Sequence, residues 1–292
     1  MTRWNDKKEP RMPRYNLEGR TVAITGATGG LGRALATELR RGGARLALMA
    51  TNQAALDELC GELGSLDQAR GWQVDVRDFD SVRTAVDAAA QHFGGIDVVI
   101  ANAGVEAVAP VSKTDPDEFA RLVDINLNGV WRTFKAGLPH ARKRRGYLLA
   151  ISSMAAFVHS PLQTGYTASK AGVWALCDSL RLEVRHEGVT VASAHPTFFP
   201  TPMTDNMVAD PAGRTLWGGH SNLLWRMVSL ESVVDQIVRG IESRSEFIVA
   251  PSHLAFVAKL PGLFRPLVES VGFSTKTITT AIELATPSRG RK

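Results

Sequence analysis

Short apolar runs alternate with longer segments of helical periodicity between residues 18 and 250. The apolar runs predict strands, and apolar residues spaced three and four apart predict amphipathic helices between them. Such alternation is typical of a parallel sheet with helices on both faces, because each crossover helix packs on the sheet. We therefore predict an α/β fold built on a doubly wound parallel sheet. The predicted strands are Thr21–Thr25, Arg45–Ala50, Gly71–Val76, Ile96–Ala101, Tyr147–Ser152, Thr190–His195 and Phe247–Ala250, and the predicted helices are Leu31–Arg41, Gln53–Leu63, Phe79–Phe93, Pro116–Arg145, Thr167–Glu187 and Glu231–Ser243.

The segments outside this alternation predict a single domain with extensions at both ends. The boundaries are residues 1–17 for a polar, basic N-terminal arm, 18–250 for the main domain, 251–275 for an apolar C-terminal segment and 276–292 for a basic tail that we expect to be flexible. Within the domain, residues 196–230 are rich in Pro, Gly, Trp and Phe. A long stretch of this composition predicts an irregular lid over a substrate site.

The apolar segment 254–273 carries a stripe of aliphatic and aromatic residues on either side of Pro261. Such a stripe must be buried against something. Lys259, Arg265 and Glu269 make the segment too charged to span a membrane. We expect it to pack on its own lid, on a neighbouring subunit of a homo-oligomer or peripherally on a membrane surface, and to help wall an apolar substrate site.

The net charge of +5 belongs to the ends of the chain. Residues 1–14 and 276–292 each carry +3, which leaves −1 for the residues between them. We therefore expect no nucleic-acid partner, because phosphate backbones require clustered Lys and Arg on the folded surface. Cys60 and Cys177 are the only cysteines, and no His/Cys spacing suits a metal. With no apolar signal segment at the N-terminus, we expect a cytoplasmic protein with reduced cysteines.

A glycine-rich turn connects the first predicted strand to the first helix. It reads Thr25-Gly26-Ala27-Thr28-Gly29-Gly30-Leu31-Gly32. Gly26, Gly30 and Gly32 suit a tight turn, a close approach of backbone to a pyrophosphate, and close packing of helix on strand. The helix N-terminus adds free N–H groups and partial positive charge for the phosphates. This turn predicts dinucleotide binding by a Rossmann-like sheet.

The spacing Thr-Gly-x-x-x-Gly-x-Gly resembles the short-chain dehydrogenase/reductase (SDR) family. Two further segments fit that resemblance. Asp75-Val76 follows the third strand, like the adenine-contacting pair of the family, and Asn102-Ala103-Gly104 follows the fourth, like its Asn-Asn-Ala-Gly motif with the first Asn replaced. Both lie where ligands bind in open α/β sheets, at the carboxyl ends of strands.

Tyr166 and Lys170 are four residues apart on a predicted helix, so their side chains share one face. A nearby lysine and an oxidised nicotinamide lower the pKa of a phenol toward working pH, as general acid–base catalysis requires. Ser153 follows the fifth strand at the same sheet edge. Asn126 is unusual in mid-helix because its side chain competes for backbone hydrogen bonds, and Asn128 is the alternative.

The resemblance covers residues 18–250 and implies the residue roles of the family. Tyr166 is implied to donate or accept the hydroxyl proton, Ser153 to orient the carbonyl, Lys170 to tune Tyr166 and hold the nicotinamide ribose, and Asn126 to hold a water that relays protons. Pro196 and Thr201 match the family after the sixth strand, whereas Thr197 replaces the usual glycine. His195 is interpreted as a packed residue at the strand end.

The second strand ends without the acid that binds the ribose 2′-hydroxyl in NAD-dependent relatives. Thr51 and Asn52 can bond a 2′-phosphate, and Arg33 is a candidate cation near it. NADP(H) is therefore favoured, and NAD(H) is the alternative. The full set of expected cofactor contacts is Gly26, Thr28, Gly29, Gly30, Leu31, Gly32, Thr51, Asn52, Asp75, Val76, Asn102, Ala103, Gly104, Tyr166, Lys170, Pro196 and Thr201.

Apolar residues surround the predicted site, which favours a lipophilic ketone, aldehyde or alcohol such as a steroid, a lipid or an aromatic carbonyl compound. They are Met154, Phe157, Leu162, Phe198, Phe199, Met203, Trp217 and Trp225. His159 and Gln163 are the candidate polar anchors. The competing hypothesis is a regulatory module that binds a dinucleotide without turnover, and the complete set of Ser153, Tyr166 and Lys170 argues against it.

Overall fold

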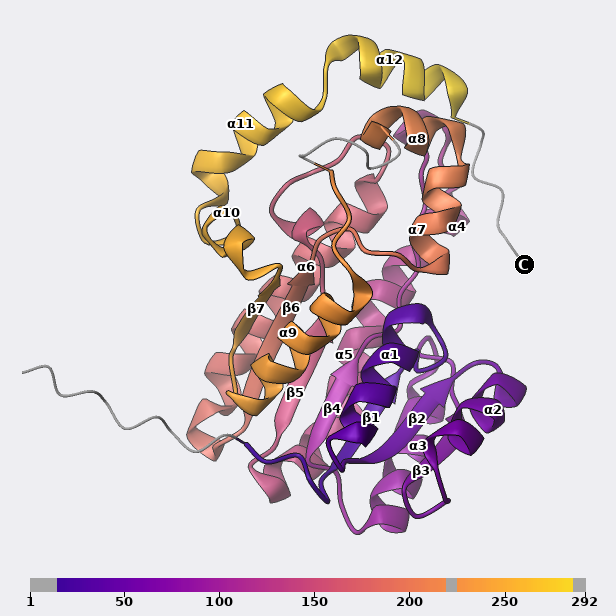
Figure 1. The fold of residues 1–292 in the computed structure, drawn as a ribbon, viewed down its shortest axis with the longest axis vertical. Helices are drawn as coiled ribbons and strands as arrows, with labels where there is room; N and C mark the ends of the chain where they lie inside the picture. Colours follow the sequence, from indigo (N-terminus) through magenta and orange to yellow (C-terminus); the bar gives the residue numbers. More distant parts are fainter. Residues whose placement is uncertain (1–14, 219–224, 286–292) are drawn as a thin grey trace, which may run out of the picture.

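A computed structural model describes residues 15–218 and 225–285. Its strands are β1 (Thr21–Thr25), β2 (Arg45–Ala50), β3 (Ala69–Gln73), β4 (Val98–Ala101), β5 (Tyr147–Ile151), β6 (Thr190–Pro196) and β7 (Phe247–Ala250). They form one sheet in the order β3-β2-β1-β4-β5-β6-β7, and every pairing is parallel (Figure 1). The direction of winding reverses between β1 and β4, which is the topological switch point where doubly wound sheets bind ligands. The predicted α/β fold is confirmed.

Helices cover both faces of this sheet. They are α1 (Gly30–Arg41), α2 (Gln53–Leu63), α3 (Phe79–Phe93), α4 (Pro116–Val123), α5 (Gly129–Arg144), α6 (Thr164–Val184) and α9 (Leu230–Glu242). Helices α1, α2 and α9 pack on one face, and α3, α5 and α6 pack on the other. Alternate residues of a strand point to opposite faces, so Ile24 joins the first core and Ala23 the second. All five residues of β1 are buried in consequence.

Two predicted elements have different bounds in the structure. The helix predicted over Pro116–Arg145 is interrupted by a π-helical turn, Asp124–Asn128, between α4 and α5. The strand predicted at Gly71–Val76 is β3, which begins earlier and ends at Gln73 because its ladder follows β2 only as far as Ala50. The other bounds differ by up to three residues at an end.

The segment 196–230 is not the irregular loop that its composition predicted. It contains α7 (Pro202–Ala209) and α8 (Pro211–Trp217). The side chains of Thr201 and Asp210 cap these helices, and proline occupies the first position of each. Proline therefore starts helices here, since its missing N–H costs nothing in a first turn. Residues 219–224 of the predicted lid lie outside the described residues.

The prediction of a flexible tail at 276–292 was wrong for its first ten residues. Residues Thr275–Leu284 form α12, which packs on α8. Ala281 and Ala285 are buried in a cluster with Trp217 and Trp225. Ile278, Ala281 and Ala285 form the apolar side of this helix, but the threonines between them weaken the helical pattern in the sequence. Residues 286–292, like the predicted arm up to residue 14, lie outside the described residues.

Between β7 and α12 the chain forms α10 (Ala255–Lys259) and α11 (Pro261–Gly272). We call α10 to α12, residues 255–284, the C-terminal arm. The arm starts near the end of β7 and passes beyond the carboxyl end of the sheet to reach α8, on which α12 packs (Figure 1). No helix of the described chain has both the length and the apolar character to cross a membrane.

Candidate active site

A cavity of about 1060 Å³ opens at the carboxyl edge of the sheet. The glycine turn, the ends of β2, β4 and β5, the lid and the C-terminal arm all contribute to its wall. The structure brings most of the predicted site residues together there. Those that line the cavity are Gly26, Thr28, Gly29, Gly30, Leu31, Gly32, Thr51, Asp75, Val76, Asn102, Ala103, Gly104, Ser153, Tyr166, Lys170, Pro196 and Thr201, and the two that do not are Asn52 and Asn126.

The glycine turn leaves the N-terminus of α1 open to the cavity. No side chain caps this helix, and its first turn holds no acid. Gly26 has φ +65°, and a Cβ on Gly32 would lie 2.2 Å from the carbonyl oxygen of Gly26, so the turn excludes larger residues. Asn102 holds the turn in place, since its amide donates to the carbonyl oxygens of Thr25 (3.1 Å) and Gly26 (3.0 Å). Free N–H groups and an uncompensated positive helix end fit a pyrophosphate.

Asp75 and Thr51 line the part of the cavity next to β2. The Asp75 carboxylate pairs with Arg77 at 2.6 Å, and this hydrogen-bonded guanidinium lowers the pKa of the carboxyl group. Asp75 therefore remains ionised where the family resemblance implies an adenine contact.

Two residues expected near a 2′-phosphate are engaged elsewhere. Asn52 does not line the cavity, because its side chain caps α2 by accepting from the backbone N–H of Ala55 at 3.1 Å. Arg33 pairs with Glu62 at 2.7 Å and with Glu58 at 3.3 Å. Thr51 is the one member of this predicted set that contributes to the cavity wall.

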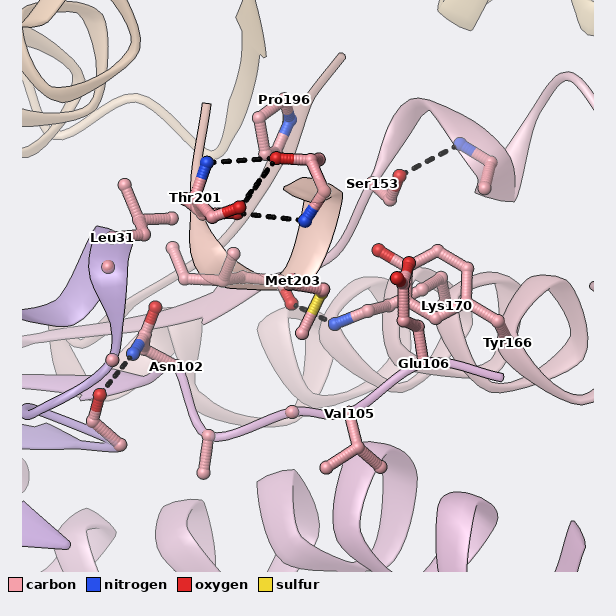
Figure 2. Close-up of a pocket in the computed structure, with 18 of the residues that line it drawn as sticks. Leu31, Asn102, Val105, Glu106, Ser153, Tyr166, Lys170, Pro196, Thr201 and Met203 are labelled. Carbon is pink, nitrogen blue, oxygen red and sulfur yellow. Dashed lines mark hydrogen bonds between the residues drawn. The ribbon is translucent and has the colours of Figure 1, made fainter. Parts of the chain in front are cut away.

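Tyr166 and Lys170 share one face of α6, as their spacing predicts (Figure 2). The ammonium of Lys170 donates to the carbonyl oxygen of Ile151 at 2.9 Å and lies 5.5 Å from the centroid of the Tyr166 ring. Burial raises the pKa of Tyr166 to about 12, while hydrogen bonding to Ser153 opposes that shift. Burial lowers the pKa of Lys170 to about 8. At neutral pH the Tyr166 phenol is therefore protonated, whereas the pKa of Lys170 lies much closer to neutral pH than that of an ordinary lysine.

Asn126 lies behind the cavity, fully buried in the π-helical turn. Its Oδ1 accepts from the N–H of Val105 at 2.8 Å, and its Nδ2 donates to the carbonyl oxygen of Val105 (2.8 Å) and to Oγ of Ser169 (3.1 Å). It thus fixes the chain after β4 against α6. The alternative, Asn128, is exposed and bonds Asp124 at 3.0 Å.

Gly104, in the connection after β4, lies close to Asn126 of the π-helical turn and to Lys170 of α6. A Cβ at Gly104 would lie 3.4 Å from Oδ1 of Asn126 and 3.5 Å from Nζ of Lys170. The glycine, the amide and the ammonium therefore converge on one point.

His195 is a packed residue near the end of β6, as predicted. Its Nε2 forms a hydrogen bond with Oγ of Ser193 at 2.8 Å. The centroid of its ring lies 4.7 Å from the ring centroid of Phe157 and 4.8 Å from that of Phe247. Burial lowers the pKa of His195 to about 3, so the imidazole is neutral at physiological pH. It does not line the cavity.

The predicted substrate residues divide into cavity wall and core. Met154, Phe198, Phe199, Met203 and Trp225 line the cavity, whereas Phe157, Leu162 and Trp217 are buried in neighbouring clusters. Of the two candidate polar anchors, Gln163 lines the cavity and His159 is exposed outside it.

Sequence reasoning missed several wall residues, of which Glu106 is the most consequential. Its carboxylate points toward Tyr166 and Lys170 (Figure 2) and raises the pKa of the Tyr166 phenol. Its position two residues after the Asn-Ala-Gly motif was the available signal. Met207 of α7 is another wall residue that sequence reasoning missed. Leu254, Val257 and Val268 also line the cavity, and they belong to the apolar segment 254–273 that we expected to wall a substrate site.

Comparison with known proteins identifies the family. Residues 20–212 match the family model described as short chain dehydrogenase. The chain belongs to the short-chain dehydrogenase/reductase family. It is 34% identical to 3beta-hydroxysteroid dehydrogenase 1 of Eggerthella lenta over 206 residues, which are 68% of this chain and 78% of that protein. It is 32% identical to dehydrogenase/reductase SDR family member 7B of Bos taurus over 274 residues, 89% of this chain and 83% of the relative.

Solved structures agree with this assignment. The crystal structure of levodione reductase covers 80% of this SDR chain and 96% of its own, with a TM-score of 0.73 and 26% identity. The protein is an NAD(P)-dependent oxidoreductase of the dehydrogenase/reductase type, and the open α1 terminus and glycine turn fit that cofactor. Among the described residues, no group of three or more His, Cys, Asp or Glu is placed to hold a metal.

Proposed function

We propose that this enzyme interconverts a lipophilic ketone or aldehyde and the corresponding alcohol, with Tyr166 as general acid and base. One observation carries the proposal. Ser153, Tyr166 and Lys170 meet in a single cavity that has a phosphate-binding turn on one side and an apolar chamber on the other. A carbonyl compound held at this junction would share the cavity with the Tyr166 phenol and with a dinucleotide on the glycine turn.

The bound nicotinamide supplies or accepts the hydride, and the protein supplies positioning and proton transfer. In reduction, the Tyr166 hydroxyl donates its proton to the carbonyl oxygen as negative charge develops there. The Ser153 hydroxyl orients the same oxygen by a hydrogen bond. In oxidation, the Tyr166 phenolate accepts the proton, and its pKa of about 12 must fall for this role. The ammonium of Lys170 and the positive charge of an oxidised cofactor act in that direction.

Asn126 acts as a positioning residue in this proposal. By fixing Val105 and Ser169, it holds the loop after β4 against the catalytic helix. The π-helical turn interrupts the regular helical hydrogen bonds next to Lys170. In reduction, the Lys170 ammonium would return a proton to the Tyr166 phenolate, and water held near the π-helical turn would then reprotonate the Lys170 amine.

The chamber beyond Tyr166 supports a lipophilic substrate. Met203, Met207, Trp225, Val257 and Val268 contribute apolar side chains to the wall, and Gln163 and Glu106 contribute polar ones. Pockets of this kind bind apolar molecules and use a small number of polar groups for orientation. The related 3beta-hydroxysteroid dehydrogenase 1 supports the same substrate class. Steroids, lipids and aromatic carbonyl compounds are the candidates.

NADP(H) is the proposed cofactor. Ala50 and Thr51 line the cavity at the end of β2, and neither carries a charge that would repel a 2′-phosphate. The Thr51 hydroxyl is available to bond that phosphate. NAD(H) remains the alternative because the candidate cation Arg33 is paired with two glutamates.

The test is oxidation of NADPH and NADH, followed by absorbance, with a panel of hydrophobic ketones and matched small ketones. We expect turnover with bulky hydrophobic ketones at a higher kcat/KM than with small ones, and a preference for NADPH. Binding of either cofactor without oxidation by any ketone, and without reduction by any alcohol of the panel, would overturn the proposal in favour of a binding module.

A further inference from the structure

Helix α11 exposes an unusual row of aliphatic side chains. Leu260 precedes the helix and Leu263, Leu267 and Val271 lie along it, and they are 54%, 68%, 60% and 72% exposed. No residue of α11 is buried. Spacings of three and four residues place these side chains on one face of the helix. We call these four residues the outer stripe.

The outer stripe is one edge of a wider apolar arc. At about 100° per residue, Phe264 and Val268 continue the same arc on the side that faces the body of the protein. Phe264 packs on the cluster that contains Val257, and Val268 lines the cavity. The described part of the chain therefore covers only half of the apolar face of α11. The polar face, with Arg265 and Glu269, points elsewhere.

Exposed aliphatic residues are concentrated in this region. Seven of the twelve large hydrophobic residues that are exposed in the described chain lie between Phe256 and Leu284. Contiguous apolar surface of this kind marks a site for a protein partner or a membrane.

The charge of the region favours a membrane with anionic lipids. Residues 251–292 contain six basic and two acidic side chains, whereas the whole chain has a net charge of only +5. Lys259 lies at the junction of α10 and α11, Arg265 lies on α11 and Lys276 at the start of α12. Arg265 pairs with Glu269 at 3.8 Å on α11, so the excess positive charge comes from Lys259, from Lys276 and from the basic residues of 286–292. Basic residues that flank an apolar helix favour its binding in the plane of an anionic lipid surface.

We propose that the outer stripe docks the enzyme on the surface of anionic lipid bilayers, with α11 lying in the membrane plane. Docking would bring the arm side of the cavity to the lipid surface, because Val257 and Val268 of the same arm line that cavity. Delivery of substrate from the bilayer then rests on the proposed function, but docking itself does not.

The experiment is cosedimentation of the full chain with vesicles of phosphatidylcholine alone and of phosphatidylcholine mixed with phosphatidylglycerol. We expect binding to the mixed vesicles, weaker binding to the neutral ones, and a loss of binding as salt is raised. The variant L263E/L267E should bind the mixed vesicles at least about tenfold more weakly, because two exposed apolar contacts become charged.

The matched control is L66E/L182E, which changes two leucines of similar exposure, 65% and 59%, outside the arm. It should bind vesicles like the unmodified chain. NADPH binding and circular dichroism establish that both variants are folded, and Val271→Glu supplies a second variant of the stripe. NADPH oxidation with a small water-soluble ketone reports the proposed activity separately from docking.

Three outcomes would overturn the proposal. One is the absence of binding to either kind of vesicle. Another is an equal loss in the arm and control variants. The third is a fall in molecular mass in solution in L263E/L267E without vesicle binding by the unmodified chain, which would assign the stripe to contact between two copies.

Discussion

Strand β1 and helix α11 are both rich in aliphatic residues, yet they bury them to opposite extents. Every residue of β1 is buried, because helices cover both faces of the parallel sheet. No residue of α11 is buried, because the arm has the cavity on one side and nothing from the described chain on the other. The sheet edge thus carries the residues of the candidate site on buried strands, whereas the arm borders the same cavity with a helix that is covered on one side only.

This contrast predicts that substitutions at the sheet edge change turnover and cofactor use, whereas substitutions in the arm change substrate affinity. The largest effect is expected at Tyr166. Tyr166→Phe removes the proton that is transferred and should lower kcat by roughly 10²–10⁴-fold. The Kd for NADPH should change little, because the ring and Lys170 remain. Stopped-flow turnover and cofactor titration measure the two quantities, and near-normal turnover would remove Tyr166 from the mechanism.

A second substitution addresses the cofactor side of the sheet edge. Ala50→Asp places a carboxylate at the end of β2, where it would bond ribose hydroxyls and repel a 2′-phosphate. The ratio of kcat/KM for NADPH to that for NADH should fall by at least about tenfold, since like charges in a partly buried site oppose binding. The KM for the ketone should be unchanged. A wide preference for NADH in the unmodified enzyme would contradict the assignment of NADP(H).

Glu106→Gln tests the electrostatics of the catalytic tyrosine. The Glu106 carboxylate raises the pKa of Tyr166, so its removal lowers that pKa. Oxidation of an alcohol requires the Tyr166 phenolate, so the rate of oxidation rises as pH increases through the pKa of Tyr166. The rising limb should therefore move to lower pH, with a several-fold higher rate at neutral pH. Asp117→Asn, at an exposed position of α4, should leave the profile in place.

The smallest effect is expected in the arm. Val268→Ser makes the cavity side of α11 polar and should raise KM several-fold for a bulky ketone, with little change for a small one. Val271→Ser lies on the exposed side of the same helix and serves as the control. Neither variant should alter the Kd for NADPH. Equal effects at the two positions, or an effect on both ketones alike, would show that the arm does not wall the substrate site.

The sequence predicts the sheet well and brings Tyr166 and Lys170 to one helix face, because both depend on local spacing. Strand and helix periods repeat within a few residues, and Tyr166 and Lys170 are one helical turn apart. The glycine turn is similarly local. Side-chain competition is harder to predict. The side chain of Asn52 can cap a helix or bond a phosphate, and the sequence does not distinguish the two. In the structure it caps α2 by accepting a hydrogen bond from the N–H of Ala55.

Contacts between distant segments account for the remaining differences. Helix α12 is stabilised by packing on α8, more than sixty residues earlier in the chain, and its threonines give a weak helical signal. Glu106 faces Tyr166 on a connection whose preceding residue, Val105, is held by Asn126 from a distant part of the chain. Neither the packing of α12 on α8 nor the position of Glu106 produces a repeating pattern of residues in the sequence.

Because Asn126 bonds the backbone of Val105, the amide hydrogen of Val105 can report slow opening of this part of the chain. Val105 belongs to no helix or strand, and amides in such connections usually exchange their hydrogen with solvent rapidly. Here the N–H points at a fully buried acceptor in the π-helical turn. Its hydrogen exchanges only when that turn and the chain after β4 separate. The lifetime of this single deuterium label therefore measures how often the chain after β4 separates from the π-helical turn behind the candidate active site.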